Sequence, residues 1–378
     1  MKKSVLAGLR PAEFMRRYWQ KTPLLSRAAL TRFENAVTRD ELFALASRDD
    51  IESRLVTRTK GRWRVCDGPF ESSELMKLPR RGWTLLVQGV DRAHSKVARL
   101  LQAFAFIPYA RLDDVMVSYA APGGGVGPHF DSYDVFLVQG TGTRRWQVSR
   151  QRDLDLAPDA PLKLLQNFVP EREWTVAPGD VLYLPPNCAH DGVAVDECIT
   201  YSVGFRAPSA QELGARFLDF LHDRLALEGR YADPHLEATQ RPGRIPQSLL
   251  GQYAAILARL SWSKEDVAEF AGRYLTESAA NVVFDRPKRP LAAAAFARRA
   301  GALGVRLALS SRMLVDDKRV FMNGEAGEPR SSARRTLTRL ADARELAAPL
   351  ALDAETWGLL YEWYNAGYIQ IRSTESQP

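Results

Sequence analysis

The chain has 378 residues, enough for two or three domains, and its 46% hydrophobic and 26% charged residues are ordinary for a soluble globular protein. No stretch approaches the run of about 18 apolar residues that a membrane span needs, and the start, MKKSVLAGLRPAEF, lacks the apolar region and cleavage site of a signal peptide. The net charge of +7 does not by itself indicate nucleic-acid binding, and three scattered cysteines exclude a disulfide framework and fit a reducing, cytoplasmic setting.

The first region, residues 1–207, opens with helical spacing over 11–19 and 39–47 and then changes to short strands. Turn signals such as PGGGVGP (122–128) separate the strand-like runs. Many short strands at this spacing predict a sandwich or barrel. The runs are rich in Val, Leu, Tyr and Phe: WTLLVQGV (83–90), DVMVSYA (114–120), DVFLVQG (134–140), RRWQV (144–148), DVLYLP (180–185) and CITYSVGF (198–205).

The second region, residues 208–287, contains helices and no strands. Ser209 and Glu212 form a predicted capping box at the start of the first helix, the second covers 247–260, and the third begins at Ser263. Two interpretations stay open: a helical subdomain packed on the barrel, or a dimerisation module. The first helix carries apolar residues at helical intervals: Leu213, Phe217, Phe220, Leu221 and Leu225.

The third region, residues 288–378, mixes helices and strands. The strand-like run RLALSSRMLV leads through Asp316 and Asp317 to RVFMNG, which predicts a hairpin. Two helices follow, one within 331–344 and one from about Asp353, before the short strand YIQI. This pattern suggests a winged-helix-like domain. The apolar run WGLLYEWY indicates packing rather than a recognition helix, so direct nucleic-acid binding is not expected.

The segment GPHFDSYDVF contains His129 and Asp131, which on a strand would point to the same face. Such a pair offers two ligands to a divalent metal, but chance pairs are common. A second signal is PGDVLYLPPNCAH, a turn and a strand that end at His190. Two histidines and one carboxylate form the facial triad of non-haem iron(II) oxygenases, which leaves room for a keto acid and dioxygen. The sequence therefore predicts an iron site.

A keto acid bound there needs a cation for its distal carboxylate. Alternation in RRWQV places Arg144 with Trp146 and Val148, and Arg145 on the opposite face, so Arg144 is the inward candidate. We interpret Cys188 as a small buried hydrophobe rather than a metal ligand. The other histidines are interpreted as packed or surface residues: His94, His222 and His235. The same alternation groups polar residues on single strand faces: Asp114 with Ser118, Thr200 with Ser202, and Tyr133 with His129 and Asp131.

These segments resemble a known family. The run DDVMVSYAAPGGGVGPHFDSYDVFLVQGTGTRRWQV, followed by PGDVLYLPPNCAHDGVA, is similar to the cupin-like JmjC-type ribosomal oxygenases of bacteria. EFMRRYWQKTPLLSRAAL (13–30) and RWRVCDGPF (62–70) look like the N-terminal signatures of that family. The resemblance implies a mainly β plus α fold: a double-stranded β-helix over 1–207, a helical dimerisation region over 208–287 and a winged-helix-like domain over 288–378.

The resemblance also implies an activity. It is the hydroxylation, dependent on iron(II) and 2-oxoglutarate, of the β-carbon of an arginine in the sixteenth protein of the large ribosomal subunit. A homodimer in the cytoplasm is expected, with no membrane contact. By position, the residues of the site are the iron ligands His129, Asp131 and His190, the keto-acid anchors Arg144 and Ser118, and the substrate-guanidinium contacts Asp114 and Tyr133.

Other functions stay open at this point. The barrel would also suit a JmjC-type demethylase or a hydroxylase of another basic protein. Arg144 argues against a non-oxidative metal cupin such as an isomerase, because a keto-acid anchor has no purpose there. A DNA-binding regulator with the barrel as ligand sensor predicts salt-sensitive, sequence-selective DNA binding. The oxygenase instead predicts succinate formation that depends on iron and a protein substrate.

Overall fold

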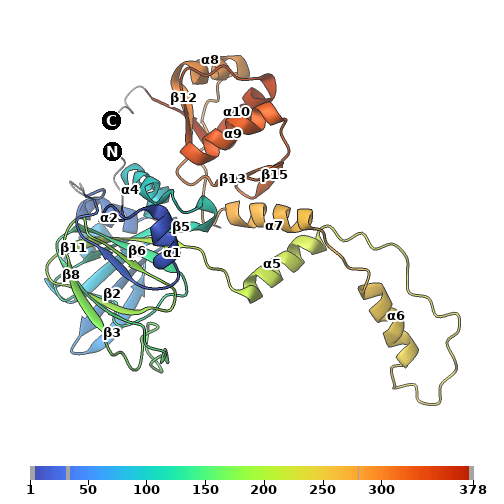
Figure 1. The fold of residues 1–378 in the computed structure, drawn as a ribbon, viewed down its shortest axis with the longest axis horizontal. Coiled ribbons are helices and arrows are strands. Elements are labelled where there is room, and N and C mark those ends of the chain that lie inside the picture. Colours follow the sequence, from blue (N-terminus) through green and yellow to red (C-terminus); the bar gives the residue numbers. More distant parts are fainter. Residues whose placement is uncertain (1–4, 31–34, 280, 374–378) are drawn as a thin grey trace.

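Figure 1 shows the computed structural model of the chain, which describes residues 5–30, 35–279 and 281–373. Met1–Ser4, part of the start in which no signal peptide is expected, lie outside the described residues. A β-rich part comes first, helices then project away from it, and a separate part made of helices and strands follows at the C-terminus (Figure 1). Within the described ranges, no helix is long and apolar enough to cross a membrane.

Short helices surround the β-rich part. The helices predicted over 11–19 and 39–47 are confirmed, with slightly earlier ends. The second of them begins with a capping box, in which Thr38 and Glu41 satisfy each other's backbone N–H groups. The helices are α1 (Pro11–Arg17), α2 (Arg39–Ala46), α3 (Ser72–Leu75) and α4 (Ser95–Leu100), with the 3₁₀ turns η1 (Val90–Arg92), η2 (Leu101–Phe104) and η3 (Tyr109–Arg111).

Two antiparallel sheets form the β-rich part. The large sheet has the order β1-β9-β6-β11-β5-β4-β2-β3, and the small sheet has the order β10-β7-β8. The six strand-like runs listed for residues 1–207 are all confirmed. The strands are β1 (Leu24–Ser26), β2 (Ser53–Thr59), β3 (Arg62–Asp67), β4 (Trp83–Val87), β5 (Leu112–Ala120), β6 (Asp134–Thr141), β7 (Arg144–Ser149), β8 (Arg172–Val176), β9 (Val181–Leu184), β10 (Ala189–Ala194) and β11 (Cys198–Phe205).

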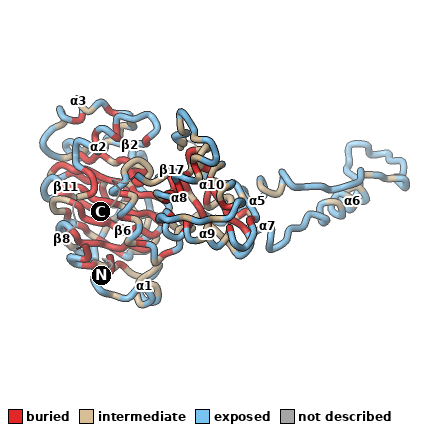
Figure 2. The backbone as a smooth tube through the Cα atoms, turned by 90° about the horizontal axis from the view of Figure 1, so that it is seen from above, coloured by how far each residue is buried: buried red, intermediate tan, exposed pale blue. Residues whose placement is uncertain are grey.

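The central strands of the large sheet, such as β6 and β11, are buried on both faces and drawn largely in red in Figure 2. In β6, Phe136 and Val138 pack with the surrounding helices, for example against Phe14 of α1. Their neighbours Val135 and Leu137 point the other way and pack against the small sheet. The two sheets therefore enclose a common interior, and burial on both faces explains why DVFLVQG reads as a continuous apolar run.

Two helices of the helical segment bury no residue against the barrel. The segment contains α5 (Ala210–His222), α6 (Gln247–Leu257) and α7 (Lys264–Thr276), and α5 and α6 have no buried residue. Both views show α6 at the outer end of an arm that extends away from the rest of the chain (Figures 1 and 2). The interpretation of this region as a subdomain packed on the barrel is therefore wrong for α5 and α6. Helix α7 instead contacts the strands of the C-terminal part.

The predicted helix starts are partly confirmed. At α7, Ser263 and Asp266 form a complete capping box. At α5, the Ser209 hydroxyl accepts from the Glu212 N–H, but Glu212 does not return the bond. Its carboxylate accepts a hydrogen bond from the Tyr274 hydroxyl at 2.6 Å, which ties α5 to α7. The capping box predicted at Ser209 is therefore only half formed, because Glu212 has a tertiary partner.

The C-terminal part contains two small sheets, β16-β12-β17 and β13-β14-β15. The predicted hairpin is confirmed as β13–β14, but RLALSSRMLV is not one strand, because a turn at Ala308–Ser311 divides it. Helices α9 and α10 pack inward with Leu337 and Trp363. The elements are α8 (Ala293–Leu303), β12 (Gly304–Leu307), β13 (Met313–Val315), β14 (Val320–Met322), β15 (Glu325–Gly327), α9 (Ser331–Ala343), β16 (Glu345–Ala347), α10 (Ala354–Ala366) and β17 (Ile369–Ile371).

Candidate functional site

A pair of backbone hydrogen bonds brings two histidines together inside the barrel. The His129 N–H donates to the His190 carbonyl at 2.9 Å, and the His190 N–H donates to the His129 carbonyl at 2.8 Å. This isolated antiparallel bridge joins the glycine-rich loop before β6 to the start of strand β10. The loop lies very close to β10, because a Cβ at Gly125 would be only 2.6 Å from the Gly192 carbonyl oxygen. Glycine is thus required where the loop passes.

The expected strand at His129 and Asp131 is not present. Strand β6 begins only at Asp134, and the residues before it follow an irregular path. Strand alternation is therefore the wrong reason for the convergence of the two side chains. Instead, the bridge to His190 places His129, and a hydrogen bond from the Asn187 N–H to the Asp131 carbonyl, 2.7 Å long, places Asp131.

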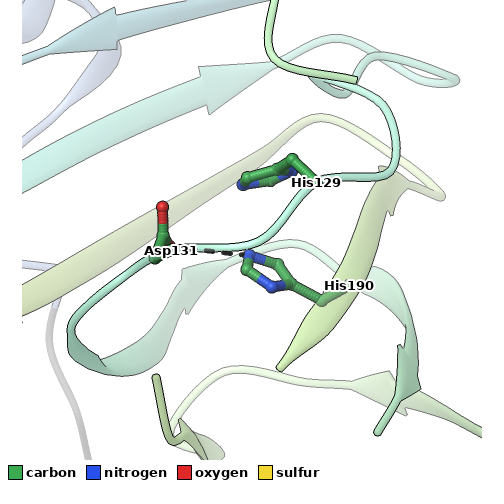
Figure 3. Close-up of side chains that lie close together, drawn as sticks. All are labelled: His129, Asp131 and His190. Carbon is green, nitrogen blue, oxygen red and sulfur yellow. Dashed lines mark ion pairs between the residues drawn. The ribbon is translucent and has the colours of Figure 1, made fainter. Parts of the chain in front are cut away.

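The structure brings His129, Asp131 and His190 together, as Figure 3 shows. One ligand atom from each side chain lies within 4.8 Å of the others, and His190 Nε2 is 3.8 Å from Asp131 Oδ2. The Nδ1 atoms of the two rings lie 2.8 Å from the Gly127 carbonyl oxygen and 2.9 Å from the Cys188 carbonyl oxygen, respectively. When Nδ1–H donates to these carbonyls, each Nε2 keeps its lone pair for a metal.

The surroundings favour the neutral, ligating form of the imidazole. His190 is only 2% exposed. Burial lowers the pKa of His190, and the neighbouring His129 lowers it further, so the ring does not carry a proton that a metal would have to displace. Burial raises the pKa of the Cys188 thiol to about 12, and its Sγ donates to the Ser149 carbonyl oxygen at 3.5 Å rather than joining the triad. Cys188 packs in the apolar interior, as expected.

Arg144 points into the interior from β7 and is 5% exposed. Its Nε and Nη2 atoms are buried and have no hydrogen-bond partner among the described residues. Arg145, the next residue, is half-exposed and lies 3.8 Å from Glu173. The alternation inferred from RRWQV is therefore confirmed. A buried guanidinium with unused donors is costly unless an anion pairs with it, so this position suits a carboxylate-bearing ligand.

Ser118 lies in the large sheet, where it is 2% exposed and pairs in register with Thr200 of β11. The Thr200 hydroxyl donates to the Gln139 side-chain carbonyl at 3.1 Å. Polar side chains thus follow one another across β5, β11 and β6. Arg144 belongs to the small sheet, so the two expected cosubstrate anchors come from different sheets of the barrel.

Asp114 is buried near the start of β5. Its Oδ2 accepts a hydrogen bond from Gln88 Nε2 at 2.8 Å and one from Arg92 Nη2 at 3.4 Å. Burial raises the pKa of Asp114 to about 6, and the nearby carboxylates of Asp91 and Asp113 contribute to the shift. The carboxyl is therefore ionised at neutral pH, but at a cost that a further cation would reduce.

Tyr133 lies in the irregular segment between the triad and β6 and is 40% exposed. Burial of its hydroxyl raises the pKa of Tyr133, and the neighbouring Asp131 raises it further, so the phenol stays neutral and can donate a hydrogen bond. Tyr133 also lines a cavity of about 660 Å³ that the barrel, α5, α7 and Arg312 of the C-terminal part enclose together. This cavity has room for a peptide segment beside Tyr133.

Sequence reasoning missed several of these groups. Gln88, Asp91 and Arg92 surround Asp114 from a loop and the turn η1, outside any strand pattern. The carbonyls of Gly127 and Cys188 that orient the histidines are backbone groups, so the residue types in the sequence do not indicate this role. The alternation on β5 could identify Asp114, but not its partners.

The chain is similar to known proteins along most of its length. Residues 99–213 match the JmjC domain family, 259–370 match a ROXA-like winged helix, and 168–268 match an AraC-like ligand binding domain. The ribosomal protein uL16 3-hydroxylase of Escherichia coli K12 is 35% identical over 349 residues, which are 92% of this chain and 91% of that protein. A probable ribosomal oxygenase of Haemophilus influenzae is 39% identical over 54% of this chain and 51% of its own.

Solved structures agree with this likeness. The ribosomal oxygenase of Escherichia coli in complex with cobalt and 2-oxoglutarate has 32% sequence identity and a TM-score of 0.83, over 96% of this chain and 98% of that one. The same protein has been solved with cobalt and succinic acid, with a TM-score of 0.80. The expected double-stranded β-helix followed by a winged-helix domain is thereby confirmed. This chain belongs to the JmjC-type ribosomal oxygenases, a family of 2-oxoglutarate-dependent enzymes.

Proposed function

We propose that the chain hydroxylates the β-carbon of an arginine in a protein of the large ribosomal subunit. The observation that carries the proposal is the convergence of His129, Asp131 and His190 in the same barrel interior as the unpaired guanidinium of Arg144. The name of the Escherichia coli relative, a uL16 3-hydroxylase, supports this class of substrate. Bound iron(II) with 2-oxoglutarate supplies the oxidising chemistry, and the chain supplies binding, orientation and exclusion of water.

The residues present fit this cofactor. Two neutral imidazoles and one carboxylate are the donor set that non-haem iron(II) takes, so His129, Asp131 and His190 would hold the metal. The buried, unpaired donors of Arg144 fit the distal carboxylate of the keto acid, and the Ser118 hydroxyl would add a second hydrogen bond. The need for such an anion favours the oxygenase over a non-oxidative cupin.

Asp114 and Tyr133 would hold the side chain of the substrate. A buried carboxylate that lies near two others attracts a guanidinium, and the neutral phenol beside it offers a hydrogen bond and a flat ring. The 660 Å³ cavity beside Tyr133 would take the neighbouring residues of the substrate chain. The substrate would thus enter from the side where the barrel meets α5, α7 and Arg312.

The projecting helices support a homodimer. Leu218 of α5, Leu257 of α6 and the nearby Trp262 are more than half exposed, at 65%, 60% and 56%. Isolated helices of this length are marginal in water unless an apolar face is covered. A second copy would cover both arms, because a two-fold dimer places the same surface on each partner. We therefore interpret this segment as the dimerisation region.

The remaining parts of the proposal concern organisation and setting. We keep the division into 1–207, 208–287 and 288–378, although α7 contacts β13, β14 and β15 and so links the last two regions. A cytoplasmic location follows from a ribosomal substrate. In the C-terminal domain, Leu337 of α9 and Trp363 of α10 point into a shared hydrophobic core. We therefore assign these helices to packing within the domain rather than to direct nucleic-acid binding.

The first prediction concerns the reaction. Incubation with iron(II), 2-oxoglutarate and ribosomal proteins of the large subunit should yield succinate and a gain of one oxygen on an arginine, measured by tandem mass spectrometry. His129→Ala should lose both products because it removes a metal ligand. His94→Ala, a histidine beside Glu41 and outside the triad, should behave like the wild type. Equal activity of His129→Ala and wild type would show that the triad is wrong, and loss of a methyl group would indicate a demethylase.

The second prediction separates the two adjacent arginines. Arg144→Leu should raise the KM for 2-oxoglutarate about 10- to 100-fold, because a hydrogen-bonded charge pair contributes about 1.5–3 kcal/mol. Affinity for Co²⁺, followed by calorimetry, should stay within a few-fold of the wild type. Arg145→Leu, which loses only a half-exposed ion pair, should leave the KM unchanged. Similar effects of both substitutions would contradict the assignment of Arg144.

The third prediction follows from the raised pKa of Asp114. Because the folded pKa of about 6 exceeds the unfolded value of 3.8, ionisation destabilises the fold as pH rises through this window. Asp114→Asn should therefore raise the free energy of unfolding by about 1–3 kcal/mol near neutral pH, and the gain should vanish below about pH 4. Urea unfolding at several pH values measures this. The variant should lose modification of arginine, yet keep its affinity for 2-oxoglutarate.

The fourth prediction tests the dimer. Leu257→Glu should shift the sedimentation coefficient from that of a dimer to that of a monomer, because a charge cannot be buried between apolar helices. Val169→Glu on the barrel, where the native side chain is 69% exposed, is the matched control and should remain dimeric. A wild-type protein that sediments as a monomer at micromolar concentration would refute the assignment.

A further inference from the structure

We propose that Gly204 determines the preference for a guanidinium by leaving open the space between Asp114 and Tyr133 into which the substrate side chain fits. The inference rests on the proposed function, in which these two residues contact the substrate. It adds a third member to the pocket, one that acts through the absence of a side chain. It also adds a reason why a charged, planar group is selected there.

Gly204 lies on β11, which runs between β5 and β6 in the large sheet. Val203 pairs with Val115 of β5, whereas Phe205 pairs with Leu112, so the register shifts between them. This irregularity leaves Asp113 and Asp114 opposite the single residue Gly204, as in a β-bulge. On the other side, Gly204 pairs with Val135 of β6, two residues after Tyr133. Gly204 therefore lies between the two proposed substrate contacts, Asp114 and Tyr133.

The fold itself does not require glycine at this position. A Cβ on residue 204 would lie 3.7 Å from Tyr133 Cε2 and 3.9 Å from Asp114 Oδ1, which are ordinary contact distances. The backbone of Gly204 is also outside the left-handed region. Gly192 is different, because a Cβ there would lie 2.4 Å from the ring of Trp146. Packing explains glycine at 192, whereas at 204 the open space in front of Asp114 and Tyr133 remains as the explanation.

The Asp114 carboxylate is arranged for a ligand in this space. Both hydrogen bonds that it accepts, from Gln88 and Arg92, go to Oδ2. Its other oxygen, Oδ1, is the one that faces Gly204. Gln88 and Arg92 thus fix the carboxylate, and Oδ1 stays available to accept from a guanidinium. The ring of Tyr133 on the opposite side suits the flat face of that group.

Neighbouring features lead to the same place. Tyr133 and Phe205 both line the 660 Å³ cavity that would hold the substrate chain. Tyr133 connects the two places, because its ring lines the cavity and its Cε2 is the atom nearest to a Cβ at position 204. A methyl group on residue 204 would narrow the space without moving the backbone, and it would obstruct the broad, planar guanidinium more than a slender alkylammonium. Gly204 therefore selects arginine over lysine.

The test compares Gly204→Ala and Gly204→Val with Gly358→Ala, an exposed helix position where a Cβ meets nothing within 4 Å. Gly204→Ala should raise the KM for an arginine-containing ribosomal peptide at least tenfold, and Gly204→Val more. For both alanine variants, the KM for 2-oxoglutarate should match the wild type, and neither should lower the midpoint of thermal unfolding; Gly358→Ala should raise it slightly, because alanine favours the helix more than glycine. The preference for the arginine peptide over its lysine counterpart should fall in Gly204→Ala.

A second measurement does not depend on turnover. Binding of arginine amide to the metal-loaded protein, followed by calorimetry, should weaken at least tenfold in Gly204→Val and stay unchanged in Gly358→Ala. Equal binding by wild type and Gly204→Val would overturn the inference, as would an unchanged peptide KM in Gly204→Ala. If the wild type binds arginine amide through Gly204 but does not hydroxylate the ribosomal peptide, then the proposed reaction is wrong and the guanidinium pocket stands.

Discussion

Two short backbone hydrogen bonds between His129 and His190 hold the site together. They fasten a glycine-rich loop to the first residues of β10, and so unite two proposed metal ligands that are distant in the sequence. Strand β10 then pairs with β7, where His190 is in register with Val148 and Ala194 with Arg144. The spacing between His190, a proposed metal ligand, and Arg144, the proposed cosubstrate anchor, is therefore set by strand geometry, at about 13 Å along the ribbon for four residues. The ribbon of β7 and β10 thus carries one proposed metal ligand and the proposed cosubstrate anchor, and the loop bound to it supplies the other two members of the triad.

The interior of the barrel combines groups whose electrostatic needs differ. Burial lowers the pKa of His190, Arg144 is a buried cation whose Nε and Nη2 lack hydrogen-bond partners among the described residues, and Asp114 is a buried anion beside other anions. Strands in different parts of the two sheets carry these groups, so they do not neutralise one another. In the proposed function each takes a different ligand: a metal ion, a dicarboxylate and a cationic side chain. Because these groups are separated, each proposed ligand would bind at its own position in the barrel.

Much of this arrangement could be predicted from the sequence because it depends on local periodicity. Alternation in a five-residue run distinguished Arg144 from Arg145, and short apolar runs located the strands of the barrel. The irregular path at Asp131 could not be predicted, since it depends on a bridge to a residue far along the chain. The same holds for Gln88, which meets Asp114 from another segment. The apolar stripe of α5 predicted burial, but α5 has no buried residue in the single chain, and periodicity carries no information on whether the covering surface is the barrel or a second chain.

The unpaired guanidinium of Arg144 has a consequence for the life of the protein in a cell. A buried cation with unused donors lowers the free energy of unfolding, and an anion that binds only the folded state restores it in proportion to the logarithm of its concentration. With the cosubstrate as that anion, the keto acid acts as a stabilising ligand as well as a reactant. Proteases that attack the open chain would then degrade the protein faster when keto acid is scarce, so its abundance would follow the supply of carbon metabolites.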